Sequence, residues 1–345
     1  MGVCHSNSKN EYEENKVQDI YIPSSLMFNE PINSIVTWKE GGIIMGSIDG
    51  TVRVLTQEGN VQYTIKVHDK SITQVVRDKK EKHVNVYTAS RDCTIGHTTI
   101  MSNEERTVQH PSFKGGHELT ISAIDVQDNL TLVSGGRDTI LNIWDITTKE
   151  IIMKNTTTSR NVITCIKWNE QNVFVQGSED LKVRIWDTRT SLLKPVDIIN
   201  DYIYFPLSID VSECHNYILT SSKGFNGVGC EGRLIDKRTL KTVQTFIGHN
   251  QDTTACLLLP NYTSSSSSSS LPFAVTASKD STIKLWDGNN NKPIVTVHDA
   301  GSMFTSICTT RGTAQNEIFH IWASTFSGKI LRYECNPKKK LLNKI

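Results

Sequence analysis

One phrase recurs along the sequence at a nearly constant spacing, and it constrains the fold more than any other feature. In the clearest copy, residues 116–145 run from a Gly-His pair through an apolar stretch and Ser-Gly-Gly-Arg-Asp to Ile-Trp-Asp. Short apolar runs of period two, bounded by Gly and Asp, predict β-strands joined by turns. Recurrence at a fixed period predicts a repeat architecture in which neighbouring units bury a continuous core. Aspartates that match the turn of the phrase are Asp49, Asp92, Asp138, Asp180 and Asp280.

Gly-His followed by Trp-Asp in a unit of roughly 40–45 residues resembles the WD40 repeat, which forms one blade of a β-propeller. The resemblance implies an all-β fold, which we expect to be a seven-bladed WD40 β-propeller. It also implies a structural tetrad in the complete blades, in which a His, a strand Ser or Thr, a turn Asp and a Trp share hydrogen bonds. The tetrads expected here are His117, Ser134, Asp138 and Trp144 in blade three, and His249, Thr276, Asp280 and Trp286 in blade six.

We divide the chain into an N-terminal arm (residues 1–16), a propeller (17–335) and a basic C-terminal tail (336–345). Residues 17–22 alternate like a strand that has no partner of its own. We expect this N-terminal strand to close the propeller by pairing with the last blade, because closure removes a free sheet edge.

Charge and motif content narrow the classes of function. The sequence has 37 Lys and Arg against 36 Asp and Glu, so no overall field favours nucleic acid as a partner. The recurring histidines would be spread around a ring, whereas metal ligands must converge on one point. No P-loop, HExxH or nucleophile elbow occurs. We therefore predict no catalytic residue, no metal and no cofactor, and a monomeric propeller that works within complexes.

The chain begins Met-Gly-Val-Cys-His-Ser, which matches the pattern for N-myristoylation of Gly2. A single myristoyl chain binds membranes only reversibly, so stable anchoring needs a second signal, and Cys4 is the candidate site for palmitate. The pattern predicts a membrane tether. An ordinary unmodified N-terminus is the alternative.

The residue before each turn aspartate is presented on the face where members of the resembled family bind partners. We expect a partner-binding face here that includes basic side chains able to pair with an acidic segment. An ordinary solvated charged surface is the alternative interpretation. Residues of this kind are Arg91, Arg137, Glu179 and Lys279, and Arg160 joins them from the loop that enters blade four.

A second candidate site is the tetrapeptide that ends the fourth repeat. Trp186, Asp187 and Arg189 resemble the Trp-Asp-x-Arg box by which some WD40 proteins dock onto the adaptor of cullin-RING ubiquitin ligases. The resemblance implies a substrate receptor without catalysis of its own, with Arg189 as the docking residue. Packing of the repeat alone is the alternative.

A narrower resemblance covers most of the propeller. The run from Ser159 to Thr164 and the loop Gly-Phe-Asn-Gly-Val-Gly-Cys-Glu at residues 224–231 resemble the WD repeat-containing protein 31 family. This resemblance implies a non-enzymatic protein that supports ciliary trafficking beside regulators of small GTPases. The sequence thus predicts a protein-interaction scaffold in the cytoplasm, tethered at a membrane or at the cilium, with the ligase receptor as the alternative.

Overall fold

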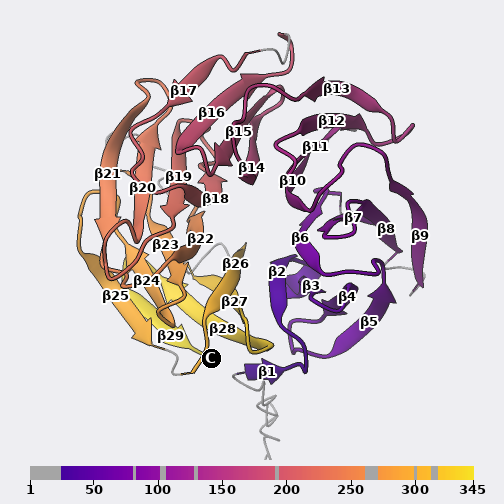
Figure 1. Ribbon diagram of the computed structural model, residues 1–345. Helices are drawn as coiled ribbons and strands as arrows, with labels where there is room; N and C mark the ends of the chain where they lie inside the picture. The colour runs from indigo at the N-terminus through magenta and orange to yellow at the C-terminus, as the bar shows by residue number, and fades with distance from the viewer. Residues whose placement is uncertain are drawn as a thin grey trace, which may run out of the picture.

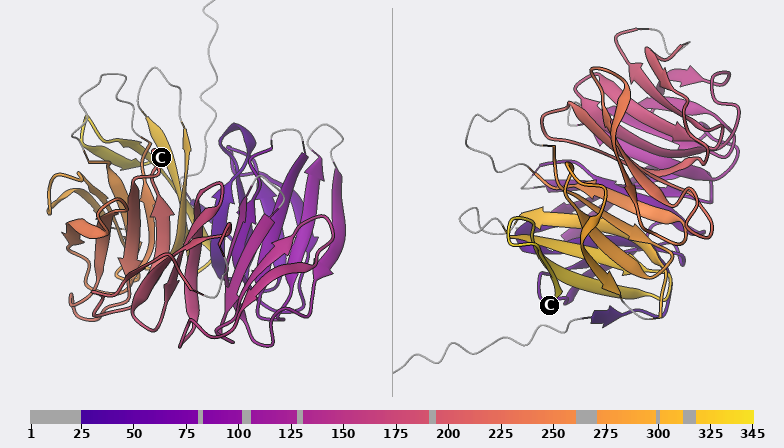
Figure 2. Two further views of the ribbon diagram at one scale, coloured as in Figure 1. Left: turned by 90° about the horizontal axis from the view of Figure 1, so that it is seen from above. Right: turned by 90° about the vertical axis from the view of Figure 1, so that its left-hand side faces the viewer.

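The computed structural model describes residues 25–80, 83–101, 106–127, 131–190, 194–260, 271–298, 301–311 and 318–345. These residues form seven antiparallel sheets arranged as blades around a central axis (Figure 1). The prediction of an all-β, seven-bladed propeller is therefore confirmed. In the side views, the strands run between two faces of the ring and the connecting loops lie on those faces (Figure 2).

The first four blades follow the chain order from the innermost strand outward. Blade one comprises β2 (Ile32–Thr37), β3 (Ile43–Ser47), β4 (Thr51–Leu55) and β5 (Val61–Lys66), with a short 3-10 helix η1 (Lys39–Gly41). Blade two comprises β6 (Ile72–Arg77), β7 (His83–Ser90), β8 (Ile95–Met101) and β9 (Arg106–Phe113). Blade three comprises β10 (Ile121–Gln127), β11 (Thr131–Gly136), β12 (Leu141–Asp145) and β13 (Ile151–Asn155). Blade four comprises β14 (Ile163–Glu170), β15 (Val173–Ser178), β16 (Lys182–Asp187) and β17 (Asp197–Ile199).

The last three blades complete the ring. Blade five comprises β18 (Pro206–Val211), β19 (Tyr217–Ser222), β20 (Glu231–Asp236) and β21 (Lys241–Ile247). Blade six comprises β22 (Thr253–Leu258), β23 (Ala274–Ser278), β24 (Thr282–Trp286) and β25 (Pro293–His298). Blade seven comprises β26 (Phe304–Arg311), β27 (Phe319–Thr325) and β28 (Lys329–Asn336), and its outer edge is formed by β1 (Ser25–Met27) and β29 (Leu341–Lys344).

The hydrophobic core consists of separate clusters, each lying between two neighbouring blades. Trp144 of blade three, for example, packs with Tyr87 and Phe113 of blade two. The cluster that joins the last blade to the first contains Trp322 and Ile330 together with Ile32 and Leu55. Successive side chains of a strand point to opposite faces of its sheet, and in these blades both faces carry apolar residues. Each blade is therefore buried against two neighbours, and the clusters follow one another around the ring.

A belt of hydrogen bonds around the central channel reinforces this packing. The second residue of an innermost strand donates a side-chain hydrogen bond to the first carbonyl of the next innermost strand. Leu207 occupies this position in blade five and has no donor. The bonds run from Asn33 to Ile72 (2.7 Å), from Thr73 to Ile121 (2.6 Å), from Ser122 to Ile163, from Thr164 to Pro206 (2.6 Å), from Thr254 to Phe304 (2.8 Å) and from Thr305 to Ile32 (2.6 Å).

Both ends of the described chain pair with the same strand of blade seven. β1 pairs with one end of β28, through Ser25–Leu331 to Met27–Lys329, and β29 pairs with its other end, through Tyr333–Lys344 to Asn336–Leu341. An N-terminal strand therefore does close the ring, but it is formed by residues 25–27. Residues 336–345, which we expected to be a basic tail, include a strand at Leu341–Lys344. Leu342 of this strand is buried in the cluster between blades six and seven.

Several sequence predictions lie outside the described residues. These are the predicted strand at residues 17–22, the arm at 1–16, and the acylation sites Gly2 and Cys4, which remain predictions. Within the ranges that the structure describes, no helix has the length and apolar character needed to cross a membrane.

The closure by β29 gives a testable difference between two adjacent leucines. Replacing Leu342, which is 3% exposed, by Ala should lower the free energy of unfolding by about 2–5 kcal/mol, as truncation of buried leucines does. Leu341→Ala is the control, because Leu341 is 42% exposed and its loss should change stability by less than about 0.5 kcal/mol. Urea denaturation measures both variants. Equal, small effects would show that these residues form a solvated tail.

Candidate protein-interaction face

The predicted tetrad residues of blade three lie in one chain of hydrogen bonds. The Nδ1 atom of His117 lies 2.9 Å from a carboxylate oxygen of Asp138, and its Nε2 atom lies 2.7 Å from Oγ of Ser134. The indole N–H of Trp144 donates to the same Oγ at 2.8 Å. Since an ionised carboxylate only accepts, Nδ1 carries the proton and Nε2 accepts from the serine hydroxyl. This series of hydrogen bonds links the indole in the core to the turn at the surface.

Blade six repeats this arrangement with Thr276 in place of the serine. His249 lies 3.0 Å from Asp280 and 2.8 Å from Oγ1 of Thr276, which accepts the indole N–H of Trp286 at 2.8 Å. Blade two keeps His68, Thr88 and Asp92 in the same geometry, but Thr98 occupies the tryptophan position. The expected tetrad residues of blades three and six are thus brought together.

Blade four holds its tryptophan and its turn aspartate with different side chains. The indole N–H of Trp186 donates to the amide oxygen of Gln176 (2.8 Å), whose amide nitrogen donates to Ser159 (2.7 Å). The turn aspartate Asp180 is held by the buried guanidinium of Arg184, at 2.6 Å and 3.0 Å. An arginine–carboxylate fork therefore replaces the histidine contact.

The tetrads hold their aspartates ionised. Burial alone would raise the pKa of Asp138, but the hydrogen bond from His117 and the backbone N–H groups of Glu118 and Ile140 keep this pKa below its ordinary value. The same balance lowers the pKa of Asp280, where burial is outweighed by His249 and Thr282. An ionised aspartate accepts several hydrogen bonds at once, so it fixes the turn between the second and third strands.

The fixed turns place one residue per blade at an equivalent position on one face of the ring, which we call the turn face. At each position the backbone N–H donates to the carbonyl of the residue immediately before the innermost strand, at 2.9–3.0 Å. The seven residues that define the turn face are Ile48, Arg91, Arg137, Glu179, Lys223, Lys279 and Phe326.

Basic side chains prevail among these positions. Arg91 and Arg137 are exposed on neighbouring blades, and among the described residues no ion pair engages either of them. Lys279 is also exposed but pairs with Asp252 at 2.7 Å, and Glu179 is half-buried. Arg160, from the loop before blade four, is exposed while its backbone N–H donates to Asp180 at 3.1 Å. The five expected partner-binding residues thus share one face but are spread over several blades.

Sequence reasoning missed an apolar patch on this face. Ile203 is 75% exposed, Phe225 is 70% exposed and Val228 is 60% exposed, and all three belong to the loops of blade five. We call these three residues the blade-five patch. Large apolar side chains with such exposure are rarely grouped on a monomer without a binding role.

The loop that carries Phe225 and Val228 is held in a fixed shape. The two residues pair with each other through both backbone N–H groups (2.9 and 3.0 Å), and Gly227 donates to the carbonyl of Asn250 in the next blade (3.1 Å). Gly229 has a φ of +77°, and a Cβ atom there would lie 2.1 Å from the ring of Tyr204. The glycines therefore permit a tight hairpin that presents its two apolar side chains to solvent.

Ile203 is held in a comparable way by the residue before it. Tyr202 is buried, and its hydroxyl lies 2.7 Å from Oγ1 of Thr220, the position that a histidine contacts in the regular blades. The sequence drew attention to the Gly-rich loop at residues 224–231 through its family resemblance, but it did not indicate that Phe225 and Val228 would be exposed.

The Trp-Asp-x-Arg box lies on the opposite face of the ring from the turn face. Trp186 is 1% exposed, and the side chain of Arg189 is 68% exposed and pairs with Asp187 at 2.6 Å. Asp236 and Arg238 form the same pair in blade five (2.7 Å), and in both cases the aspartate also accepts the arginine's backbone N–H. The aspartate thus caps a turn in more than one blade.

The central channel contains buried ionisable side chains. A cavity of about 350 Å³ is lined by the innermost strands and includes Asp125, Lys167 and Asp210. The charge of Asp125 is the main cause that raises the pKa of Lys167, whereas burial raises the pKa of Asp210. Burial also raises the pKa of Cys256 in the same lining, which favours a thiol over the nucleophilic thiolate. Within the described ranges, no three His, Cys, Asp or Glu side chains gather as metal ligands would.

The tetrad hydrogen bonds predict that equivalent substitutions in blades two and three lower the free energy of unfolding by different amounts. Ser134→Ala should lower the free energy of unfolding by about 1–3 kcal/mol, because it leaves the buried indole N–H of Trp144 without an acceptor. Thr88→Val is the matched control, because blade two has no tryptophan indole that Thr88 could accept from. The loss of stability in this variant should therefore be smaller. Urea denaturation compares the two. A loss for Ser134→Ala no larger than that of the control would contradict the role of the serine.

The lowered pKa values predict acid sensitivity. An unfolded aspartate binds a proton near pH 3.9, whereas Asp138 and Asp280 bind theirs only at lower pH in the folded state. The contribution of these two ionised aspartates to folding stability is therefore complete above about pH 5, and it is lost as the pH falls below about 4. The double variant Asp138→Asn, Asp280→Asn should be less stable at pH 7 and show a flatter decline from pH 5 to pH 3 in chemical denaturation. A decline as steep as in the parent protein would be evidence against this assignment.

Comparison with known proteins supports the repeat assignment. The family model described as WD domain, G-beta repeat matches residues 109–145, 152–187 and 240–287. A protein of Anopheles gambiae named ribosome biogenesis protein WDR12 homolog is 24% identical over 296 residues, covering 78% of this chain and 65% of the relative. Proteins of the same name from Aedes aegypti and Drosophila mojavensis are each 24% identical, over 66% of this chain and 57% of the relative. The chain thus spans about three fifths of their length.

These relatives correct part of the sequence interpretation. Their name differs from that of the WD repeat-containing protein 31 family, and nothing in the comparisons supports a ciliary role or a lipid anchor. The predicted location in the cytoplasm at a membrane or cilium is wrong, because it is contradicted by relatives named as ribosome biogenesis proteins. What the ring of seven sheets and the matched repeats do show is that this chain is a seven-bladed β-propeller containing WD40 repeats.

Proposed function

We propose that this chain is a non-catalytic scaffold that binds protein partners on its turn face, and that it does so during ribosome biogenesis. The blade-five patch is the observation that carries the first part of the proposal. Binding energy in protein interfaces concentrates in a few apolar or aromatic side chains surrounded by weaker contacts. Ile203, Phe225 and Val228 are large, exposed and held by fixed loops, so little ordering entropy opposes their binding.

The basic positions supply a second point of attachment on the same face. Arg91 and Arg137 come from neighbouring blades, away from blade five in chain order, and both guanidinium groups are exposed. A guanidinium forms forked, charge-assisted hydrogen bonds with carboxylates, so an acidic segment is the partner that fits this pair. A scaffold with an apolar and a basic contact site can hold a large partner at two points or bring two partners together.

The place in ribosome biogenesis rests on the names of the matched relatives alone. At this level of identity, surface side chains differ widely between propellers, and function lies in those side chains rather than in the fold. The proposal therefore needs its own test. We expect the protein to co-sediment with ribosome-assembly particles in a sucrose gradient of a cell extract, whereas recovery only in the light fractions would contradict this part.

A ubiquitin-ligase receptor is the second candidate function, and the exposure of Arg189 favours it. A side chain that is 68% exposed beside a buried tryptophan is available to an adaptor. The equivalent pair of Asp236 and Arg238 in blade five weighs against a dedicated docking residue, because it shows the same arrangement.

Affinity purification of a C-terminally tagged protein, quantified by mass spectrometry, tests the turn face. The variant Phe225→Asp, Val228→Asp should lose partner chains by at least roughly fivefold, because charge cannot be buried in an apolar interface. Ile152→Asp is the control, since Ile152 is 51% exposed on the outer strand β13. An unchanged set of partners would contradict the proposal. A cullin adaptor that is captured by the parent protein and lost on Arg189→Ala would instead support the second candidate.

A further inference from the structure

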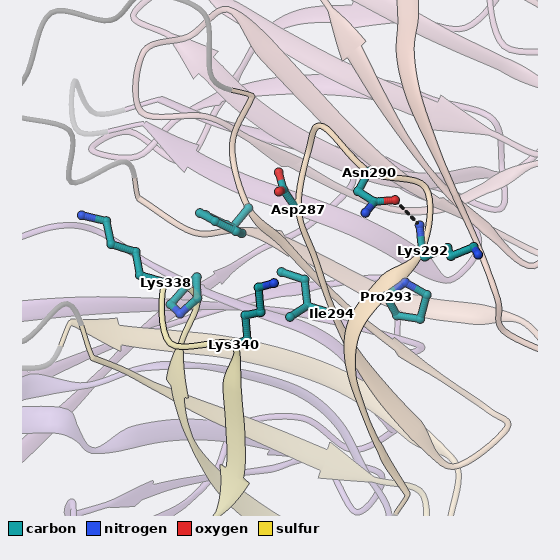
Figure 3. A pocket seen from close by; sticks show the side chains of 9 residues that line it. Asp287, Asn290, Lys292, Pro293, Ile294, Lys338 and Lys340 are labelled. Carbon is teal, nitrogen blue, oxygen red and sulfur yellow. Dashed lines mark hydrogen bonds between the residues drawn. The ribbon is translucent and has the colours of Figure 1, made fainter.

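A lysine-rimmed cleft lies between blades six and seven on the face opposite the turn face. It is formed by the connection between β24 and β25 on one side and by the hairpin between β28 and β29 on the other (Figure 3). Its volume is about 350 Å³, near the lower end of the range for ligand pockets, about 300–1,000 Å³. The lining residues are Phe273, Asp287, Asn290, Lys292, Pro293, Ile294, Pro337, Lys338 and Lys340.

The two turns that form the walls have defined shapes. In the first, Asp287 accepts the backbone N–H of Asn289 at 2.9 Å, and Asn290 accepts the backbone N–H of Lys292 at 3.2 Å. In the second, the backbone N–H of Lys340 donates to the carbonyl of Pro337 at 3.1 Å, and Lys340 has a φ of +55°. Because β29 is seated on β28, this hairpin is a fixed wall of the cleft.

The interior of the cleft is apolar and its rim is positive. Phe273, Pro293 and Ile294 are half-buried and Pro337 is buried, whereas Lys292, Lys338 and Lys340 are exposed. Figure 3 shows the side chain of Lys340 extending beside Ile294, with Lys338 and Lys292 at opposite edges. Asp287 is the single carboxylate among the lining residues, and it already caps its own turn.

We propose that this cleft binds an acidic peptide segment of a partner protein, with an apolar side chain of the segment inserted between the two turns. The apolar interior accepts such a side chain, and carboxylates on either side of it pair with the lysines at the rim. The cleft is too small for a folded domain but fits a short extended segment.

A peptide fits the cleft better than a nucleic acid. Single-stranded nucleic acid is bound by a continuous positive groove with exposed aromatic faces on which bases stack. Here the lining contains no arginine, its one aromatic residue is half-buried, and two prolines form part of the walls. The chain as a whole has a formal net charge of only +1, so no long-range field favours nucleic acid.

This site is independent of the proposed turn-face function, because it lies on the other face and involves other blades. Together the two sites would let the propeller hold partners on both faces of the ring. Failure of one assignment therefore leaves the other standing.

Fluorescence anisotropy with the full chain tests the cleft. The probe is a fluorescein-labelled peptide, Glu-Glu-Leu-Phe-Glu-Glu, which should bind in low salt and weaken as salt is added. The double variant Lys292→Glu, Lys340→Glu should weaken binding by roughly tenfold or more, because each exposed pair contributes modestly and charge reversal adds repulsion. Lys154→Glu, which changes an exposed lysine on the outer strand β13, should leave binding unchanged.

Changes in the probe separate the apolar from the charged contribution without altering the protein. Replacing Leu-Phe by Ser-Ser in the peptide should weaken binding at least fivefold, which would support insertion of an apolar side chain. Equal binding of this peptide, equal binding to the double lysine variant, or tighter binding of an oligouridine RNA that the lysine variant abolishes would each overturn the proposal. Thermal melting of the variants verifies that all are folded.

Discussion

The ring of sheets depends on side-chain hydrogen bonds that pass from each innermost strand to the main chain of the next. Asn33, Thr73 and Thr305 are examples of the donors, and each binds the first carbonyl of the next innermost strand. Apolar packing between blades is not directional, so it fixes their separation better than their height along the axis. The hydrogen bonds set that height, since a shift of one residue would break the belt and also place the wrong side chains between the sheets.

Blade five departs from this rule, and its loops also carry the proposed interaction surface. Leu207 lacks a donor, whereas Asp210 accepts the backbone N–H of Leu258 and Asp252 accepts that of Gly224. With its anchor supplied by blade six, the loop between β19 and β20 does not need a turn aspartate of its own. The loop can therefore be longer here, and it exposes Phe225.

How far the sequence predicted the molecule depended on the range of the interactions involved. The blade number and the positions of the tetrad side chains follow from a local phrase, so His117 and Trp144 lie where the repeat places them. The strand β29 was not predicted, because a lysine-rich end resembles a solvated tail until the free edge of β28 is known. The blade-five patch and the lysine-rimmed cleft combine residues from separate turns, and no local pattern indicates which side chains remain exposed.

The shared outer edge of β28 links the structure to the order in which the chain is made. β1 is made before any blade, and its partner β28 lies some 300 residues further along the chain. Domains generally begin to fold as they emerge, from the N-terminal side. Here the early blades can form before blade seven has been made, but the ring cannot close until β28 is present. Closure of the ring is therefore a late event in folding, although β1 is the first strand to be made.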